Sequence, residues 1–381
     1  MEKNSYASDQ IVLPEGGIDC SEGCNPYGYP EGILQVARAF KSERFAPYPH
    51  SMAAYNGICA YWKSQCFLKR DNIMLTDGSI SAIYIINNIF NVKGAKVLGI
   101  APQFTDFGAN IRLLGMEYVS VPLRRENNFQ IDIEELLDKI TGDLSLLYID
   151  NPNNPTGYLY TRREMNQIRD LVKKYDLFLF SDEVYREFIY TGSPYISACH
   201  LEGIENNVVL IDSVSKRYSE CGIRIGALIT KNKEIRDAVM KFCQARLSPP
   251  LIGQIAAEAS LDAGEDYLRD TYDEYVERRK CLIDGLNRIP GVYSPIPMGA
   301  FYTVAKLPVD DSDKFCAWCL SEFEYEGQTV FMAPASGFYT TPGSGRNEVR
   351  IAYVLKKDDL NRALFVLQKA LEAYPGREMK D

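Results

Sequence analysis

The chain has 381 residues, of which 46% are hydrophobic and 24% are charged, and its formal net charge at pH 7 is −9. This length exceeds one typical core and predicts two domains, and the composition is ordinary for a globular protein. The negative charge excludes a general attraction to nucleic acid, so a few placed cations must hold any anionic ligand.

The chain contains ten cysteines and only two histidines, His50 and His200, and these numbers limit the metal and redox chemistry that it can carry out. Apart from one CxxC, Cys316 to Cys319, the cysteines form no short paired spacing. We therefore expect no metal site and free thiols in a reducing cytoplasm. The first ten residues contain no apolar export segment, and no apolar run is long enough to span a membrane. The expected location is cytoplasmic, with no membrane partner.

The first two thirds of the chain predict a sheet with covered faces. A Gly- and Pro-rich arm precedes a segment with helical spacing at residues 33–42. From about residue 70, short apolar segments alternate with helical ones. Strands are expected within 72–79, 95–102, 144–152, 177–183, 207–213 and 224–230, and helices at 80–90 and 161–176. Near-continuous apolar strands separated by helices predict a buried, mostly parallel sheet.

The pattern changes after a mostly helical stretch at residues 249–291. Strands are expected within 292–308 and 347–355, and helices near 312–326 and 358–373. The predicted fold class is therefore α/β, with helices covering the sheet of a large domain at 46–280. A smaller α+β domain would come from residues 281–381, together with an N-terminal arm at 1–45 that packs against it.

Chemistry-bearing residues follow the predicted strands at their carboxyl ends, where ligands bind in open α/β sheets. Gly78 and Ser79 stand just before a helix, which is typical of a phosphate seat. Later strands deliver Phe104, the segment "NPNNPTG" (151–157), Asp182, Tyr185, Ser213, Ser215, Lys216 and, eight residues on, Arg224. Each residue alone is explained by a turn, a helix cap or a solvated charge. Their order at successive strand ends favours one shared function.

This set resembles the fold-type I pyridoxal-phosphate enzymes, specifically the class I/II aminotransferase family. The resemblance covers nearly the whole chain and is strongest in "NPNNPTG", "SDEVY" and "SVSKRYSECGIRIGA". The segments "GAFY" (299–302) and "EVRIAY" (348–353) are also similar to the C-terminal domain of that family. The resemblance implies an aspartate aminotransferase-like fold and pyridoxal 5′-phosphate as the cofactor.

The resemblance also implies a role for each residue. Lys216 would form the Schiff base with the cofactor aldehyde and carry a proton, and Asp182 would pair with the pyridine nitrogen. Asn154 and Tyr185 would hydrogen-bond the phenolic oxygen, and Phe104 would stack on the ring. The phosphate would be held by Gly78, Ser79, the Ile80 backbone, Ser213, Ser215 and Arg224. Tyr48 would reach the phosphate of the neighbouring subunit, so the active site would be complete only in a homodimer.

The substrate pocket is defined more weakly. Arg350 matches the arginine that binds the α-carboxylate of the substrate, and Asn154 and Tyr27 are further candidate contacts. Aspartate aminotransferases carry a second arginine before a proline pair, and aligning "FCQARLSPPLIG" on its prolines puts Cys243 there. Arg246 lies nearby and is a weak candidate for reading the substrate side chain. The alternative, that Arg246 is only a solvated residue at the end of a helix, is equally well supported by the sequence.

We therefore expect an aminotransferase that moves an amino group between an acidic or aromatic L-amino acid and a 2-oxo acid such as 2-oxoglutarate. "GAFY" favours the aspartate and aromatic branch, whereas "IDCSEGCNPYG" (18–28) and "APYPHS" (46–51) resemble histidinol-phosphate aminotransferases and threonine-phosphate decarboxylases. Histidinol-phosphate aminotransferase, and a pyridoxal-phosphate decarboxylase or C–S lyase, stay open as alternatives. Some relatives are effector-binding proteins fused to a DNA-binding domain, but about 30 residues precede the first expected helix, and no nucleic-acid partner is expected.

Overall fold

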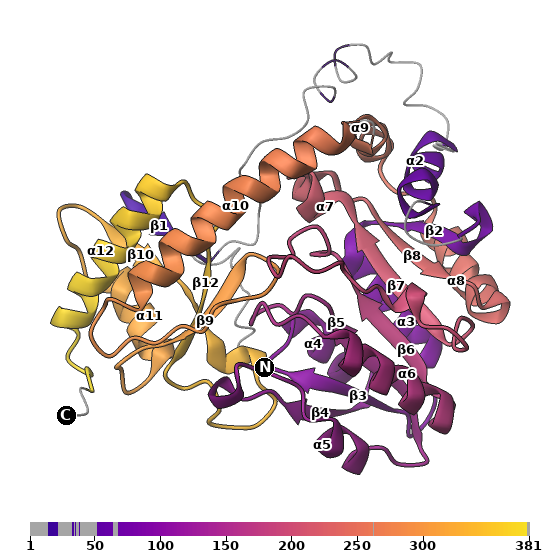
Figure 1. The fold of residues 1–381 in the computed structure, drawn as a ribbon, viewed down its shortest axis with the longest axis horizontal. Coiled ribbons are helices and arrows are strands. Elements are labelled where there is room, and N and C mark those ends of the chain that lie inside the picture. Colours follow the sequence, from indigo (N-terminus) through magenta and orange to yellow (C-terminus); the bar gives the residue numbers. More distant parts are fainter. Residues whose placement is uncertain are drawn as a thin grey trace.

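A computed structural model describes residues 14–21, 33, 35, 38, 52–63, 68–261 and 263–378. These residues form a part built on a seven-stranded sheet and a smaller part built on a three-stranded sheet, joined by the long helix α10 (Gly264–Leu286) (Figure 1). The predicted α/β class with a second, smaller domain is confirmed. The predicted boundary at residue 280 falls inside α10, and the one at residue 45 lies outside the described residues, so both boundaries stay predictions.

The large sheet has the strand order β2-β8-β7-β6-β5-β3-β4. In that order the strands span Ile73–Thr76, Gly226–Thr230, Val208–Ser213, Phe178–Asp182, Leu144–Asp150, Lys96–Ala101 and Glu117–Pro122. β8 is antiparallel to both of its neighbours, and the other pairs are parallel, so the mostly parallel sheet is confirmed. The sequence reasoning missed β4, an edge strand whose residues are mostly half-buried and therefore carry a weak apolar pattern.

Helices cover both faces of the large sheet. Side chains alternate between the two faces along each strand, and apolar side chains on both faces need to be buried. One face packs with α3 (Gly78–Phe90), α4 (Thr105–Leu113) and α8 (Lys233–Arg246). The other packs with α2 (Met52–Lys63), α5 (Ile133–Asp138) and α6 (Arg162–Tyr175). Burial on both faces explains the near-continuous apolar runs. Because helices cover both faces of the sheet, a ligand can approach the ends of the strands but not the faces.

The smaller part contains the antiparallel strands β11 (Ala333–Pro334), β12 (Glu348–Ala352) and β9 (Tyr302–Lys306), with helices α11 (Ser312–Ser321) and α12 (Lys357–Ala373). β1 (Gly17–Asp19) pairs in parallel with β10 (Thr329–Phe331), so this stretch of the N-terminal arm packs where we expected. Within 292–308 the named strand begins only at Tyr302. Pro295 and Pro297 precede it, and proline cannot donate to a strand ladder.

Short elements complete the described chain. They are α7 (Val214–Arg217), α9 (Leu251–Leu261) and the 3₁₀ turns η3 (Arg70–Asn72), η4 (Arg125–Asn127), η5 (Ala198–His200), η6 (Cys221–Ile223) and η7 (Ala335–Phe338). The helical stretch expected at 249–291 is therefore two helices, α9 and α10. Within 33–42, the three described residues, Ile33, Gln35 and Arg38, are helical.

One expectation about the cysteines is wrong. Free thiols are found at Cys20, Cys59, Cys221, Cys243, Cys281, Cys316 and Cys319, but Cys199 is disulfide-bonded. Spacing along the chain reveals only neighbouring cysteines and gives no information on pairs that folding brings together.

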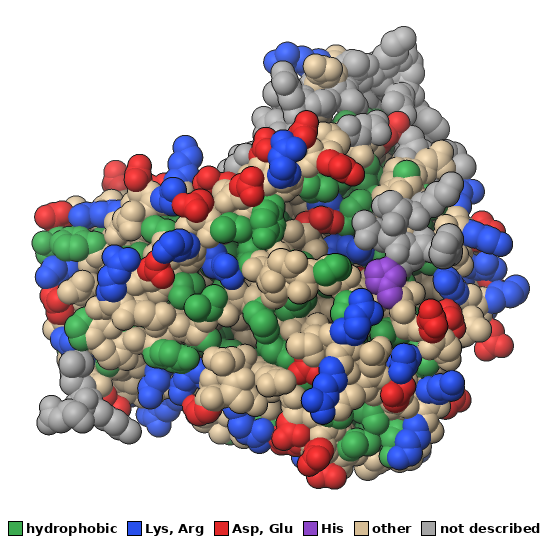
Figure 2. Space-filling model, viewed as in Figure 1, with side chains coloured by type: hydrophobic (Ala, Val, Ile, Leu, Met, Phe, Trp, Pro, Cys, Tyr) green, Lys and Arg blue, Asp and Glu red, His purple; other side chains and the backbone are tan. Residues whose placement is uncertain are grey.

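The distribution of charged side chains on the surface agrees with the expectation that the chain has no general attraction for anions. On the face seen in Figure 2, positive and negative side chains are interspersed, without a broad region of one sign. None of the helices in the described ranges has both the length and the apolar character needed to cross a bilayer. Binding of an anion therefore depends on individual cations in the site.

Glu220 is a buried carboxyl in the loop between α7 and η6. Its side chain packs against α9, where the Ser260 hydroxyl donates to Glu220 Oε1. Within the described residues Glu220 Oε2 has no hydrogen-bond partner. Burial raises the pKa of Glu220 to about 7, and the hydrogen bond from Ser260 lowers it only in part. Ionised Glu220 is therefore a local cost to the fold.

Glu220→Gln should stabilise the protein at pH 8 and change little near pH 4. Between the unfolded value of about 4.3 and pH 7 the native state binds the extra proton, so the wild-type unfolding free energy falls as pH rises. Glutamine avoids that cost and can still accept from Ser260, for a gain of about 3 to 4 kcal/mol at pH 8. Urea unfolding at several pH values measures it. An equal effect of the substitution at pH 5 and pH 8 would contradict the buried, ionising carboxyl.

Candidate active site

Lys216 lies on α7, a single helical turn that directly follows strand β7. Ser213 begins this turn, because its hydroxyl accepts a hydrogen bond of 3.1 Å from the Ser215 amide. The Lys216 Nζ atom lies 3.7 Å from Cys221 Sγ and 6.0 Å from the ring centroids of Tyr185 and Phe301. The short helix thus presents an amine beside two aromatic rings at the end of the sheet.

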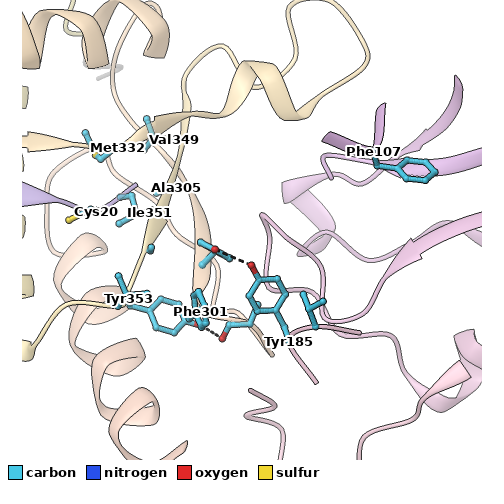
Figure 3. Packing of buried hydrophobic residues seen from close by; sticks show 14 of the residues in the cluster. Cys20, Phe107, Tyr185, Phe301, Ala305, Met332, Val349, Ile351 and Tyr353 are labelled. Atoms are coloured by element: carbon cyan, nitrogen blue, oxygen red, sulfur yellow. Dashed lines mark hydrogen bonds between the residues drawn. The ribbon is translucent and has the colours of Figure 1, made fainter. Parts of the chain in front are cut away.

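Those two rings come from the two parts of the molecule. Tyr185 follows β6 and Phe301 precedes β9, and their rings meet edge to face with centroids 5.1 Å apart (Figure 3). Tyr302, next to Phe301, brings its hydroxyl to 3.0 Å from the Tyr185 hydroxyl. The amine of Lys216 therefore lies near the junction of the large and the small part.

A seat for an anion lies at the N-terminus of α3. Gly78, Ser79 and Ile80 form its first turn, whose amide groups have no partner within a helix and attract negative charge. Arg224 follows η6 with a left-handed φ of 56°, and its Nη2 donates to the Asp77 carbonyl over 3.2 Å. Gly78 has a left-handed φ of 79°, which favours glycine, and a Cβ atom there would lie 2.3 Å from Arg224 Nη2 and displace the guanidinium.

Two buried carboxyls, Asp150 and Asp182, lie side by side at the ends of β5 and β6. Burial raises the pKa of each to about 7, and the charge of Asp150 adds to the effect on Asp182. Asp150 accepts hydrogen bonds from the Asn153 side chain (2.7 Å) and the Asn154 amide (3.0 Å). Asp182 accepts one from the Val184 amide at 3.3 Å. A cationic group placed against Asp182 would therefore be stabilised.

Arg350 connects the small part to this edge of the sheet. It projects from β12, is only 1% exposed, and donates to Asn154 Oδ1 over 3.2 Å and to the Ser21 carbonyl over 2.6 Å. Its guanidinium lies 4.4 Å from the centroid of the Tyr302 ring. A planar, buried guanidinium is suited to grip a carboxylate in two hydrogen bonds.

The remaining candidates are placed less centrally. Phe104 is half-buried at the start of α4 and packs against the core. Arg246 ends α8, and its guanidinium contacts Asp77, Ser81 and the Leu75 carbonyl. Tyr27 and Tyr48 lie outside the described residues.

Sequence reasoning missed two residues of this site. Asp150 directly precedes "NPNNPTG", so its position before that loop was available as a signal. Tyr302 is the last residue of "GAFY", a segment similar to the C-terminal domain of the family. Asp150 contacts Asn153, three residues away, whereas Tyr302 contacts Tyr185, 117 residues away. The chain pattern alone does not reveal such partners.

The arrangement has one matching group for each reactive end of pyridoxal phosphate. The α3 seat and Arg224 suit its phosphate, the Lys216 amine suits its aldehyde, and the buried Asp182 suits its ring nitrogen. Fold and site together therefore define a pyridoxal-phosphate-dependent α/β enzyme.

Comparison with known proteins gives the family. Residues 18–367 match the family model for aminotransferase class I and II. An aspartate aminotransferase of Pyrococcus horikoshii is 29% identical over 97% of this chain and 93% of its own, and an aromatic-amino-acid aminotransferase of Thermococcus litoralis is 29% identical over 92% and 85%. A solved aromatic aminotransferase from Pyrococcus horikoshii superposes with a TM-score of 0.84 at 26% identity, covering 97% and 99%. The chain belongs to the class I and II aminotransferases, and it is a pyridoxal-phosphate-dependent aminotransferase acting on amino and oxo acids.

Proposed function

We propose that the enzyme transfers the amino group of an acidic or aromatic L-amino acid to a 2-oxo acid such as 2-oxoglutarate. The observation that carries this proposal is the pair formed by Lys216 at the end of β7 and the buried Arg350 on β12. The first supplies an amine for the cofactor, and the second a fork for the α-carboxylate that every amino acid carries. The relatives named as aspartate and aromatic aminotransferases support the choice of donor.

Each residue near Lys216 has a distinct proposed task. Bound pyridoxal phosphate supplies an electron sink for the bonds at the α-carbon of the amino acid. Lys216 holds the aldehyde end and moves a proton at the α-carbon, while Asp182 holds the ring nitrogen in its cationic form. Asn154 and Tyr185 donate to the phenolic oxygen, and Phe104 covers the ring.

The phosphate is proposed to lie on the first turn of α3. Backbone amides of that turn, the hydroxyl groups of Ser213 and Ser215, and Arg224 would neutralise its charge. Arg224 is already fixed by a 2.9 Å hydrogen bond to the Cys221 carbonyl, so little side-chain freedom is lost on binding. This preorganisation favours tight retention of the cofactor.

We also propose that two copies of the chain form a cytoplasmic homodimer in which Tyr48 completes the neighbouring site. The support is an apolar surface where α8 ends and α9 begins: Phe242, Leu247 and Ile252 are 39%, 50% and 58% exposed. Large apolar side chains exposed along one short stretch of the chain favour burial against a partner. Light scattering coupled to size exclusion should give twice the chain mass. A monomer at micromolar concentration would contradict the proposal.

Half-reactions test the proposed activity most directly. Purified enzyme is mixed with single amino donors, namely the amino acids glutamate, aspartate and phenylalanine and the amino alcohol ester histidinol phosphate, and the visible band of the bound cofactor is followed. Transamination converts that band to the one of the amine form of the cofactor, and 2-oxoglutarate restores it. Release of CO2, ammonia or pyruvate without this conversion would instead indicate a decarboxylase or lyase.

Tyr302→Phe should raise the pH midpoint of the visible absorbance change of the loaded enzyme by about half a unit. The Tyr302 hydroxyl can donate to Tyr185 and make it a stronger donor to the phenolic oxygen. Without that support the phenolic oxygen of bound cofactor would be more negative, so Lys216 Nζ beside it would keep its proton to higher pH. Half a unit corresponds to part of one neutral hydrogen bond of about 1 kcal/mol.

The matched control is Tyr353→Phe. Its hydroxyl is also buried but donates to the Ala300 carbonyl over 3.1 Å, away from Tyr185. The midpoint should not move in this variant. An equal shift in both variants, or none in Tyr302→Phe, would show that Tyr302 does not tune the site.

A further inference from the structure

Arg246, at the C-terminal end of α8, lies against the turn that would hold the cofactor phosphate. Its Nε is 3.2 Å from Asp77 Oδ2, its Nη1 donates to Ser81 Oγ over 3.1 Å, and its Nη2 donates to the Leu75 carbonyl over 3.0 Å. The guanidinium therefore spans the end of β2 and the first turn of α3. These contacts commit it to the anion seat rather than to the side chain of a substrate.

Asp77 occupies the N-cap position of α3 but does not cap the helix. An N-cap aspartate ordinarily accepts hydrogen bonds from the second or third amide of the helix. In the described part of the chain the Asp77 side chain makes no such bond, and its Oδ1 is buried without a hydrogen-bond partner. Its other carboxylate oxygen faces Arg246. The ion pair thus turns the carboxylate away from amides that a phosphate needs.

A carboxylate released at this position would oppose the cofactor in two ways. It could accept from the amides of Ser79 and Ile80 and so occupy the seat itself. Its negative charge would also repel a phosphate bound a few ångströms away. Arg224 cannot prevent this, because its guanidinium holds the backbone carbonyl of Asp77 and not the side chain.

We propose that Arg246 is a positioning residue that keeps the Asp77 carboxylate off the phosphate seat and neutralises its charge. The inference rests on the proposed binding of the cofactor phosphate at α3 and assigns Arg246 a role different from reading the substrate. Two arginines then act on the two sides of Asp77. Arg224 contacts the phosphate, and Arg246 keeps the seat open for it.

The test is the dissociation constant of pyridoxal phosphate, measured by absorbance titration of apoenzyme. Arg246→Gln should raise it about tenfold, the size of effect expected from a partly buried ion pair beside a charged ligand. Asp77→Asn should leave it within threefold of wild type. The double variant Asp77→Asn with Arg246→Gln should return to the Asp77→Asn value, because no carboxylate then needs restraint.

The matched control is Arg236→Gln on the same helix, where the guanidinium hydrogen-bonds to the neighbouring Asp237. It removes the same charge and should not change the dissociation constant. An unchanged constant in Arg246→Gln, or the absence of recovery in the double variant, would overturn the proposal. A higher KM for glutamate with unchanged cofactor affinity would also overturn it and would favour substrate reading. Failure of the wild-type apoenzyme to bind the cofactor would contradict the proposed function itself.

Discussion

Lys216→Ala should lower kcat by about 10⁵-fold and abolish the cofactor adduct that borohydride reduces. In the proposed roles of Lys216, the variant would lose both the amine that holds the aldehyde end of the cofactor and the base that moves a proton at the α-carbon. Positioned proton transfer alone contributes about 10²- to 10⁴-fold, and covalent catalysis adds to it. The change removes a side chain from a site lined by Cys221, Tyr185 and Phe301. The free energy of unfolding should therefore change little.

Two further variants show whether the loss of activity comes from losing the Lys216 amine or from losing a positive charge. Lys216→Arg keeps a cation but offers no neutral amine near pH 7, so it should be as inactive as the alanine variant. Lys231→Ala removes a lysine just after β8, a strand that runs opposite to β7, and should leave both kcat and the adduct unchanged. Mass spectrometry of the reduced, digested protein locates the modified peptide. A modified lysine other than Lys216 in the wild-type enzyme would show that the assignment is wrong.

The sequence allowed the large sheet to be predicted because its strands are buried on both faces. Segments such as 144–152 and 207–213 carry continuous apolar runs, and β5 and β7 fall inside them. Prediction failed for β4, whose half-buried edge residues lack that run, and for residues 292–301. There the aromatic and apolar residues suggested a strand, but prolines interrupt the ladder.

The site could be predicted to the extent that its residues follow strands directly. Asp182, Lys216 and the α3 turn stand at strand ends in the chain, and the fold brings them to one edge of the sheet. Contacts made between distant segments were not predictable. The hydrogen bond between Tyr185 and Tyr302 spans 117 residues, and the ion pair of Arg246 with Asp77 joins the end of α8 to the N-cap of α3. The first contact depends on how the two parts pack against each other, and the second on how α8 packs against α3 within the large part.

Asp182→Asn should lower kcat/KM by about 10³-fold, the second largest effect that we expect. Removing one preorganised electrostatic partner of a reacting group costs about 10²- to 10³-fold, and the substitution would also remove the charge proposed to hold the ring nitrogen cationic. Asparagine has nearly the same shape and can still accept from the Val184 amide, so packing is preserved. Reconstituted enzyme with saturating cofactor should be assayed. Activity within tenfold of wild type would contradict the role of Asp182.

The pH dependence of cofactor binding provides an independent test of the same residue. Burial raises the pKa of Asp182 to about 7 in the cofactor-free protein, so the carboxyl is ionised mainly above pH 7. A cationic ring partner prefers the ionised form, and affinity attributable to Asp182 should therefore rise as pH increases through 7. Asp182→Asn should remove this rise. Asp150→Asn should move it to lower pH, because the neighbouring negative charge that raises the pKa is gone. A wild-type rise that persists unchanged in Asp182→Asn would assign the titration to another group.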